Sequence, residues 1–233
     1  MIFNGIDFSE KLKISNIRRP MIATQSITLK KVPGKPGKKF VRKDLEEIRV
    51  EIDVEIKDTT KSNLRAAIRD LASMLYTTEE KVLILPDETN LYYMAILSGD
   101  TNLDELTYLG KTTLTFICSD ALAYGADKSG ALGAVLINNG SYPTKGVITV
   151  TLDVAADPLQ VSLTGSGEAI YIQEGLIGDV FIIDLELETV KRNGALDMTS
   201  VYLESDFFEL PVGEFTVNTS HGSGTLAFKE RWL

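Results

Sequence analysis

The sequence predicts a mainly β chain with one main helix, in which an α+β N-terminal domain precedes a β-sandwich C-terminal domain. Apolar and polar residues alternate strictly from Ile48 to Ile56, as in a strand with one buried face. One apolar stripe with a 3.6-residue period runs from Lys61 to Tyr76. Beyond residue 133, about seven or eight short apolar segments are separated by turn residues, which is typical of a sandwich.

The domain boundaries are expected at 1–120 for the first domain and 134–233 for the sandwich, whose terminal strand could return to the first domain. Residues 121–133 form the expected junction, because they are rich in Ala, Gly and Ser and show little periodicity. The net charge of −9 is uneven, with 18 Lys and Arg against 17 Asp and Glu up to Cys118, and 6 against 16 afterwards. This asymmetry indicates two domains with different neighbours.

In the first domain, residues 28–43 should form the other arm and the tip of a long hairpin with the strand at 48–56, and the tip at 32–40 contains two prolines and two glycines. The strand at 48–56 and the helix at 61–76 follow, and Asp58, Thr59 and Thr60 are candidate N-caps of the helix. The remaining strands of this domain are predicted at 81–85, 91–97, 105–109 and 112–118. A helix on one face of an antiparallel sheet makes this domain α+β.

The second domain should contain only short strands joined by turns. Two Asn-Gly pairs, at Asn139-Gly140 and Asn193-Gly194, are strong hairpin signals because both turn positions need positive φ. The strands are predicted at 134–137, 147–154, 159–163, 169–173, 180–190, 198–203, 214–217 and 225–228.

The hairpin segment from Lys30 to Lys43 is strongly basic and admits three interpretations. Its lysines could prevent an edge strand from pairing with strands of other chains. It could be an arm that reaches an acidic neighbour, such as the second half of a partner subunit. It could also bind nucleic acid, although Phe40 is its only aromatic residue and the chain is acidic overall. We expect no specific nucleic-acid binding.

No catalytic, cofactor or metal site is predicted. His221 is the only histidine and lies in a glycine-rich turn. Gly110-Lys111-Thr112 lacks the earlier glycine of a phosphate-binding loop, since Glu105 stands there. Asp184, Glu186 and Glu188 alternate along one predicted strand. We interpret them as a solvated outer face, with a calcium contact or glycoside hydrolysis as the sharper alternatives.

The single cysteine, Cys118, stands in an apolar run and is expected to be a buried hydrophobic residue. One cysteine forms no internal disulfide, so the fold requires no oxidising compartment. The N-terminus shows no basic stretch followed by an apolar region, and no apolar run approaches the length of a membrane span. We therefore expect a chain that is made in a cytoplasm and does not contact a membrane.

Several segments, in this order, resemble the phage distal tail proteins of long non-contractile-tailed phages and prophages of Gram-positive bacteria. The resemblance covers nearly the whole chain. The segments that carry it are Phe3-Asn-Gly-Ile-Asp-Phe8, Ile17-Arg-Arg-Pro20, Cys118-Ser-Asp-Ala-Leu-Ala-Tyr-Gly125, Asn138-Asn-Gly140 with Tyr142-Pro-Thr144, Asp184 with Val190-Lys-Arg-Asn-Gly194, Phe207-Phe-Glu-Leu-Pro-Val-Gly213 and Phe228-Lys-Glu-Arg-Trp-Leu233. One departure is Ala121-Leu122, where the family often has Pro-Tyr.

The resemblance implies a structural subunit of the virion tail tip, synthesised in the cytoplasm of the bacterial host. It implies a homo-hexameric ring of first domains with galectin-like sandwiches outside. The ring would join the tail tube protein to the tail-associated fibre or lysin protein, with the tape-measure protein as a further possible partner. From the basic hairpin and the Arg-Arg-Pro turn, we expect subunit-interface residues at Arg18, Arg19, Lys35, Lys38, Lys39 and Arg42.

Two other functions remain open. A carbohydrate-binding module that recognises a host cell-wall glycan is the alternative. Against it, Trp232 is the only tryptophan and lies in the terminal segment rather than inside the sandwich. An enzyme would need a constellation of side chains that the sequence does not contain.

Overall fold

The computed structural model describes residues 1–57, 63–99, 103–104 and 111–233. Two compact units are formed, unit 1 by Met1–Ala123 with Leu233 and unit 2 by Tyr124–Trp232. Each is mainly β, and α1 (Leu64–Leu75) is the one α-helix among the described residues. The predicted fold class is therefore confirmed.

Unit 1 contains one sheet of eight strands and a separate two-stranded ribbon. The order in the sheet is β2-β1-β7-β8-β10-β6-β3, and β9 also pairs with β10. The strands of the sheet are β1 (Ile2–Phe3), β2 (Ile6–Asp7), β3 (Leu12–Arg18), β6 (Ile48–Ile56), β7 (Lys81–Ile84), β8 (Tyr93–Leu97), β9 (Leu103–Asp104) and β10 (Lys111–Cys118). The ribbon consists of β4 (Gln25–Lys31) and β5 (Lys38–Leu45).

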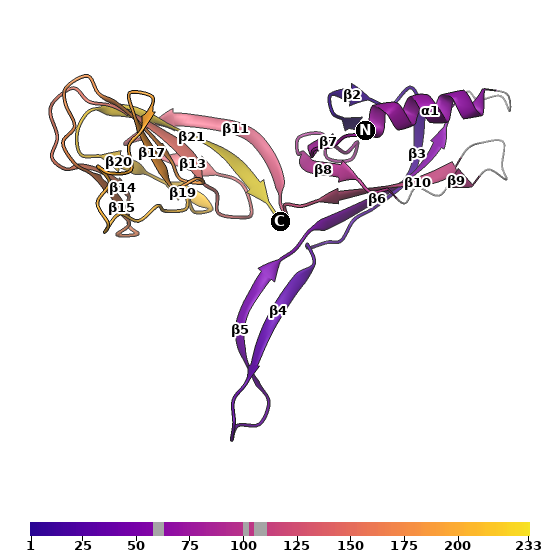
Figure 1. The fold of residues 1–233 in the computed structure, drawn as a ribbon, viewed down its shortest axis with the longest axis horizontal. Coiled ribbons are helices and arrows are strands. Elements are labelled where there is room, and N and C mark those ends of the chain that lie inside the picture. The colour runs from indigo at the N-terminus through magenta and orange to yellow at the C-terminus, as the bar shows by residue number, and fades with distance from the viewer. Residues whose placement is uncertain (58–62, 100–102, 105–110) are drawn as a thin grey trace. The chain divides into compact units, whose positions relative to one another are not determined.

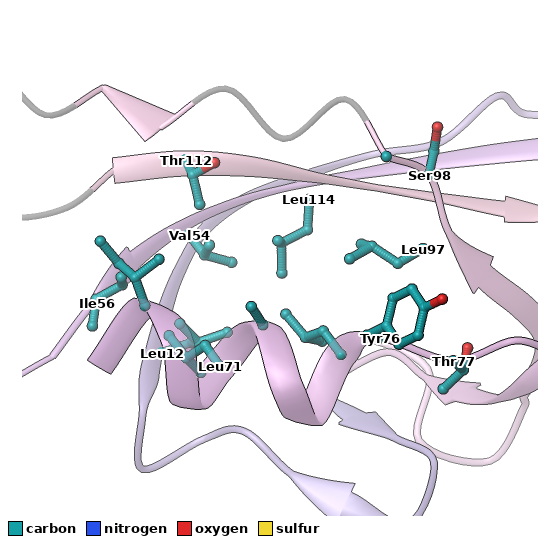
Figure 2. Close-up of a pocket in the computed structure, with 14 residues that line it drawn as sticks. Leu12, Val54, Ile56, Leu71, Tyr76, Thr77, Leu97, Ser98, Thr112 and Leu114 are labelled. Carbon is teal, nitrogen blue, oxygen red and sulfur yellow. The ribbon is translucent and has the colours of Figure 1, made fainter. Parts of the chain in front are cut away.

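Strand β6 organises unit 1 because its alternation makes one face apolar. Val50 and Ile52 are fully buried, whereas Glu51 and Asp53 on the opposite face are half-buried. Helix α1 lies along the apolar face and contributes buried Leu71 and Leu75 (Figures 1 and 2). Strand β10 pairs with β6 along its whole length, from Lys111 opposite Glu55 to Cys118 opposite Ile48.

The prediction for β6 is confirmed at both ends, but other boundaries in unit 1 differ. The helix was expected to begin at Lys61, whereas α1 begins at Leu64 after Asn63, whose side chain makes no capping hydrogen bond. The N-cap candidates at 58–60 and the strand predicted at 105–109 lie outside the described residues. The arm expected to pair with 48–56 does not do so, because β4 and β5 pair with each other over 25–45 whereas β6 pairs with β3 and β10.

Unit 2 contains one six-stranded sheet, one three-stranded sheet and one two-stranded sheet. Their orders are β11-β21-β13-β16-β17-β18, β15-β14-β20 and β12-β19. The strands are β11 (Ala123–Ala131), β12 (Leu136–Asn138), β13 (Gly146–Thr151), β14 (Leu159–Leu163), β15 (Ala169–Ile172), β16 (Val180–Asp184), β17 (Thr189–Arg192), β18 (Ala195–Leu196), β19 (Gly213–Phe215), β20 (Val217–Thr219) and β21 (Ser223–Trp232).

The core of unit 2 joins the larger sheet to the smaller ones, as in a sandwich. Ile148 from β13 and Phe181 from β16 share one buried cluster with Val161 from β14 and Ile170 from β15. In β13 and β14 the inward-facing residues come from alternate positions, because successive side chains point to opposite faces. This core leaves the other face of the six-stranded sheet in water.

Several predictions for the second half are wrong in detail. Residues 121–133, expected as a junction, contain strand β11, which pairs with β21 inside the six-stranded sheet. The terminal strand β21 pairs with β13 and β11 and so belongs to unit 2. The strand expected at 198–203 is reduced to a single bridge between Val201 and Ile172.

The two Asn-Gly signals have different outcomes. Asn193 and Gly194 have φ of 51° and 85° and join β17 to β18, so the hairpin predicted there is confirmed. Asn139-Gly140 does not close a hairpin, because β12 before it pairs with β19 and β13 after it pairs with β16 and β21. Instead, the Asn138 side chain accepts a hydrogen bond from Gly140 N at 3.0 Å.

The different environments of two isoleucines give a test of this core. Ile52→Ala should lower the free energy of unfolding by about 3 kcal/mol, because it leaves a cavity in the core of unit 1. Ile27→Ala makes the same chemical change at a side chain that is 55% exposed and should change stability by less than about 0.5 kcal/mol. Urea unfolding of both variants measures the difference, and equal losses would contradict the assigned core.

Candidate functional site

The ribbon of β4 and β5 has one apolar and one polar face. Directly opposed residues of an antiparallel pair share a face. Leu29 lies opposite Phe40, and Ile27 lies on the same face opposite Lys43. We call Ile27, Leu29 and Phe40 the apolar ribbon face. On the other face, Thr28 lies opposite Arg42, and the remaining pairs there are also polar.

The apolar ribbon face is open to solvent. Ile27, Leu29 and Phe40 are 55%, 48% and 56% exposed. Among the described strands, β4 and β5 pair only with each other, which Figure 1 shows as a ribbon of their own. A two-stranded ribbon is marginally stable by itself, and contiguous exposed apolar side chains mark contact sites. The ribbon therefore has the properties of a docking element.

A bulge and a basic end complete the ribbon. Val41 is the extra residue, since the register shifts between Thr28–Arg42 and Leu29–Phe40. Lys35 lies in the turn at the end of the ribbon and is exposed. Lys38 is on the apolar ribbon face, whereas Lys39 is on the polar face. Cationic side chains thus border an apolar centre, the usual arrangement of a protein contact surface.

The structure separates the six expected interface residues into two groups. Four are on the ribbon, where Arg42 makes an ion pair of 2.9 Å with Asp44 on the same face. The other two, Arg18 at the end of β3 and Arg19 after it, are engaged within the subunit. Arg19 contacts Asp87 at 3.0 Å and Glu88 at 3.1 Å. Whether any of the six contacts another subunit remains a prediction.

Arg18 is bound to the acidic face of β6. Its guanidinium donates to Asp53 at 2.9 Å and to Glu51 at 3.0 Å. Thr113 on the neighbouring strand donates its hydroxyl to Asp53 at 2.7 Å. These bonds, that of Arg18 first, hold the pKa of Asp53 below its usual range. The arrangement ties three strands together on the polar side of the sheet.

An apolar groove of about 510 Å³ lies between α1 and the sheet (Figure 2). Leu71 from the helix and Val54 and Leu114 from the sheet point into it. Its few polar groups include Thr77, whose buried hydroxyl makes no hydrogen bond. Such a lining can receive apolar side chains, and the lining residues that the structure describes include no charged residue and no histidine.

A second groove of similar volume, the polar groove, lies within unit 2 on the outer face of the six-stranded sheet. Lys128 on β11 and Lys229 on β21 line it, together with Glu186 in the turn after β16. Arg231 of β21 donates to Glu186 at 2.7 Å. The groove therefore combines hydrogen-bond donors and acceptors, and Arg231 and Glu186 are already paired, although Arg231 Nε is buried without a hydrogen-bond partner.

The candidate chemical groups do not form a catalytic constellation. The three acids expected on one strand are not aligned, because β16 ends at Asp184 and residues 185–188 form a turn. In that turn, Asp184 accepts the backbone N–H groups of Glu186 and Leu187 at 2.9 and 3.0 Å. Glu188 instead faces Lys145 at 3.7 Å. The aligned acidic face was therefore a wrong prediction.

His221 and Cys118 also lack catalytic surroundings. The Nδ1 atom of His221 lies 2.9 Å from Ser220 Oγ in a turn, and neither groove includes this pair. Burial raises the pKa of Cys118 to about 12, so its thiol is protonated and unreactive at neutral pH. In the described part of the chain, no cluster of His, Cys, Asp or Glu is suited to a metal ion. The helix α1 is too short and polar to cross a membrane.

Two parts of the candidate surface were missed from the sequence. The apolar ribbon face could have been found from the alternation of Ile27 and Leu29, which the neighbouring lysines obscured. The polar groove had a weaker signal, namely that most cations of the acidic half lie close to β11, β13 and β21. Only the sheet pairing brings them together.

Two family models match the chain in sequence order. The phage tail protein RIFT-related domain matches residues 6–118. The siphovirus-type tail component C-terminal domain matches residues 139–232. The distal tail protein of Bacillus phage SPP1 is 22% identical over 241 residues, covering 100% of this chain and 95% of that protein. The chain belongs to the siphophage distal tail protein family.

Comparison of structures agrees with family membership. The crystal structure of SPP1 Dit, described as a hub of the adsorption apparatus in phages that infect Gram-positive bacteria, aligns with a TM-score of 0.82. The identity is 20%, and the alignment covers 100% of this chain and 98% of that one. At this identity the likeness establishes the fold. As a member of the family, the chain is a structural component of the phage tail tip and assembles with other tail components.

The ion pair of Arg18 can be tested by titration. Arg18→Met should raise the pKa of Asp53 towards its usual value, because the first of its stabilising hydrogen bonds is lost. Carboxyl NMR titration measures this shift. Lys39→Met, which removes a cation from the ribbon, should leave the pKa of Asp53 unchanged.

The same pair fixes a pH dependence of stability. A carboxyl with a lowered folded pKa contributes stability above its unfolded pKa of about 3.9, and loses it as pH falls through the folded value. Arg18→Met should therefore be less stable than the parent at pH 7, with the difference shrinking in acid. A difference that grows below about pH 3 would contradict the assigned pair.

Proposed function

We propose that this tail-tip subunit forms a homo-hexameric ring in which the ribbon of one copy docks on the next. The observation that carries the proposal is the exposed apolar ribbon face. Burial of apolar surface contributes about 25 cal/mol per Å², so leaving Ile27, Leu29 and Phe40 in water has a continuing cost. Contact with a neighbouring copy removes that cost and completes the ribbon.

Ring closure follows from the nature of this contact. A ribbon on one side of a subunit and its receiving surface elsewhere form a heterologous interface, which generates a ring when the rotation closes. The lysines of the ribbon add long-range attraction to acidic neighbours and fix the register. Unit 2, with six Lys and Arg against fifteen Asp and Glu, is acidic enough to be such a neighbour.

The ring would join the tail tube protein to the tail-associated fibre or lysin protein, with the tape-measure protein as a further contact. Synthesis in the cytoplasm of the bacterial host would precede assembly into the virion. The subunit would act without catalysis or a cofactor. In support, the thiol of Cys118 is protonated and the acids of the turn after β16 are engaged with backbone or cations.

Adjacent residues on opposite faces of β4 provide a sharp test. Leu29→Asp places a charge in the centre of the proposed interface and should weaken each contact at least about 100-fold, or roughly 3 kcal/mol. Thr28→Asp adds the same charge to the same strand on the polar face, opposite Arg42, and should leave assembly unchanged. Light scattering would measure whether the mass is six times 25.6 kDa.

Phage tails assembled with each variant provide the second measurement, because isolated subunits can require a partner to nucleate the ring. Tails with the Thr28→Asp subunit should show the ring in electron micrographs, and tails with Leu29→Asp should not. Circular dichroism must show that both variants are folded. Equal assembly of the two variants would refute the ribbon contact.

A further inference from the structure

The polar groove gathers an unusual share of the cations in unit 2. This unit contains six Lys and Arg residues, and four of them line the groove, namely Lys128, Lys145, Lys229 and Arg231. They come from β11, from β21 and from the residue just before β13, and these three strands are adjacent in the sheet. On an otherwise acidic unit, this concentration identifies one surface with a distinct chemistry.

Each cation of the groove has a carboxylate beside it. Arg231 contacts Glu186 at 2.7 Å, and Lys229 contacts Asp127 at 3.5 Å. Lys145 contacts Glu188 at 3.7 Å, and Lys128 contacts Glu230 at 3.3 Å. Glu188 and Glu230 do not line the groove, whose own carboxylates are those of Asp127, Asp184 and Glu186. With four cations beside these three carboxylates, the surface presents donors and acceptors side by side with little net charge.

This balance determines the ligand chemistry. An anionic ligand would be repelled by Asp127 and Glu186, and a cationic ligand by the lysines and Arg231. An uncharged polyhydroxyl compound meets neither penalty, since each hydroxyl can donate to a carboxylate and accept from an ammonium or guanidinium group. Hydrogen bonds to charged partners are also stronger than those between neutral groups.

The floor and size of the groove also suit a saccharide. Gly146, Val147 and Ala227 provide small, partly apolar surface between the charged pairs. The volume of about 510 Å³ is within the range of ordinary ligand sites. Stacking on Tyr124 is restricted, because the Arg231 guanidinium already lies over this ring at 5.8 Å. Hydrogen bonding would therefore dominate.

We propose that the polar groove of unit 2 is a binding site for an uncharged oligosaccharide. The site is independent of ring formation, because all of its residues belong to unit 2 and none to the ribbon. On a tail-tip subunit, such a site would contact sugars of the host surface. Affinity should be weak for one copy, with Kd of about 1 mM, and would rise through multivalency in an assembly.

Saturation-transfer NMR on the full chain can test the site, because this method tolerates large assemblies. The probes are maltotriose, lactose and chitotriose as uncharged oligosaccharides, and a glycerol-phosphate oligomer as an anionic comparison. At least one uncharged probe should bind more tightly than the anionic one. No signal from any uncharged probe at about 10 mM, or binding of the anionic probe alone, would overturn the proposal.

Two exposed positions on β21 provide a matched pair of variants. Ala227→Trp fills the floor of the groove and should weaken binding at least about tenfold. Thr225 lies two residues earlier on the same strand, is also exposed and does not line the groove. Thr225→Trp should therefore change the affinity for the probe less than about twofold. Equal effects of the two substitutions would place the ligand elsewhere and refute the site.

Glu186→Gln tests the chemistry without filling the groove. It leaves Arg231 without its carboxylate, so binding of the uncharged probe should fall about tenfold while the glycerol-phosphate oligomer gains affinity. Because Glu186 is in an exposed turn, the fold should persist even where Ala227→Trp is destabilising. Unchanged selectivity in Glu186→Gln would overturn the charge-matching argument.

Discussion

The alternation along β6 is the constraint on which unit 1 depends. Its buried face accepts α1, and its opposite face carries Asp53, which Arg18 and Thr113 bind from the two neighbouring strands. A slip of one residue in the register would move Ile52 into water and Asp53 into the core. Burial of one face and ion pairing on the other therefore specify the same register, and the long ladder with β10 then fixes the order of the sheet.

The chain runs from β5 into β6 with only Glu46 and Glu47 between them, yet the apolar residues of the two strands differ in burial. Apolar residues of β6 are covered within the subunit, whereas those of β5, such as Phe40, remain exposed. Both strands contain apolar residues, so the difference in burial depends on what packs against each strand. In the proposed ring, a neighbouring copy would cover the ribbon, and assembly would then be linked to folding in this region.

Periodicity predicted the elements whose environment is local. The alternation at 48–56 gave β6 at its observed boundaries, and the 3.6-residue stripe gave α1 except for its first turn. Periodicity failed where the backbone conformation of one residue ends a strand. Glu188 adopts φ of 52° and divides a predicted strand into β16 and β17. The polar groove was beyond such reasoning, because Lys128 and Glu186 become neighbours only through the pairing of distant strands.

The two candidate surfaces differ in the free-energy cost of leaving them exposed to water. The apolar ribbon face is unfavourable in water at all times, so it suits a contact that is made once and kept. The polar groove differs, since its charged groups pair with one another, as Arg231 does with Glu186, and Glu186 is exposed to solvent. A ligand there must displace water and share existing hydrogen bonds, which limits affinity and keeps binding reversible. The proposed permanent assembly through unit 1 and the proposed reversible contact through unit 2 would therefore follow from the same principle, which is the free-energy cost of each surface when it is unoccupied.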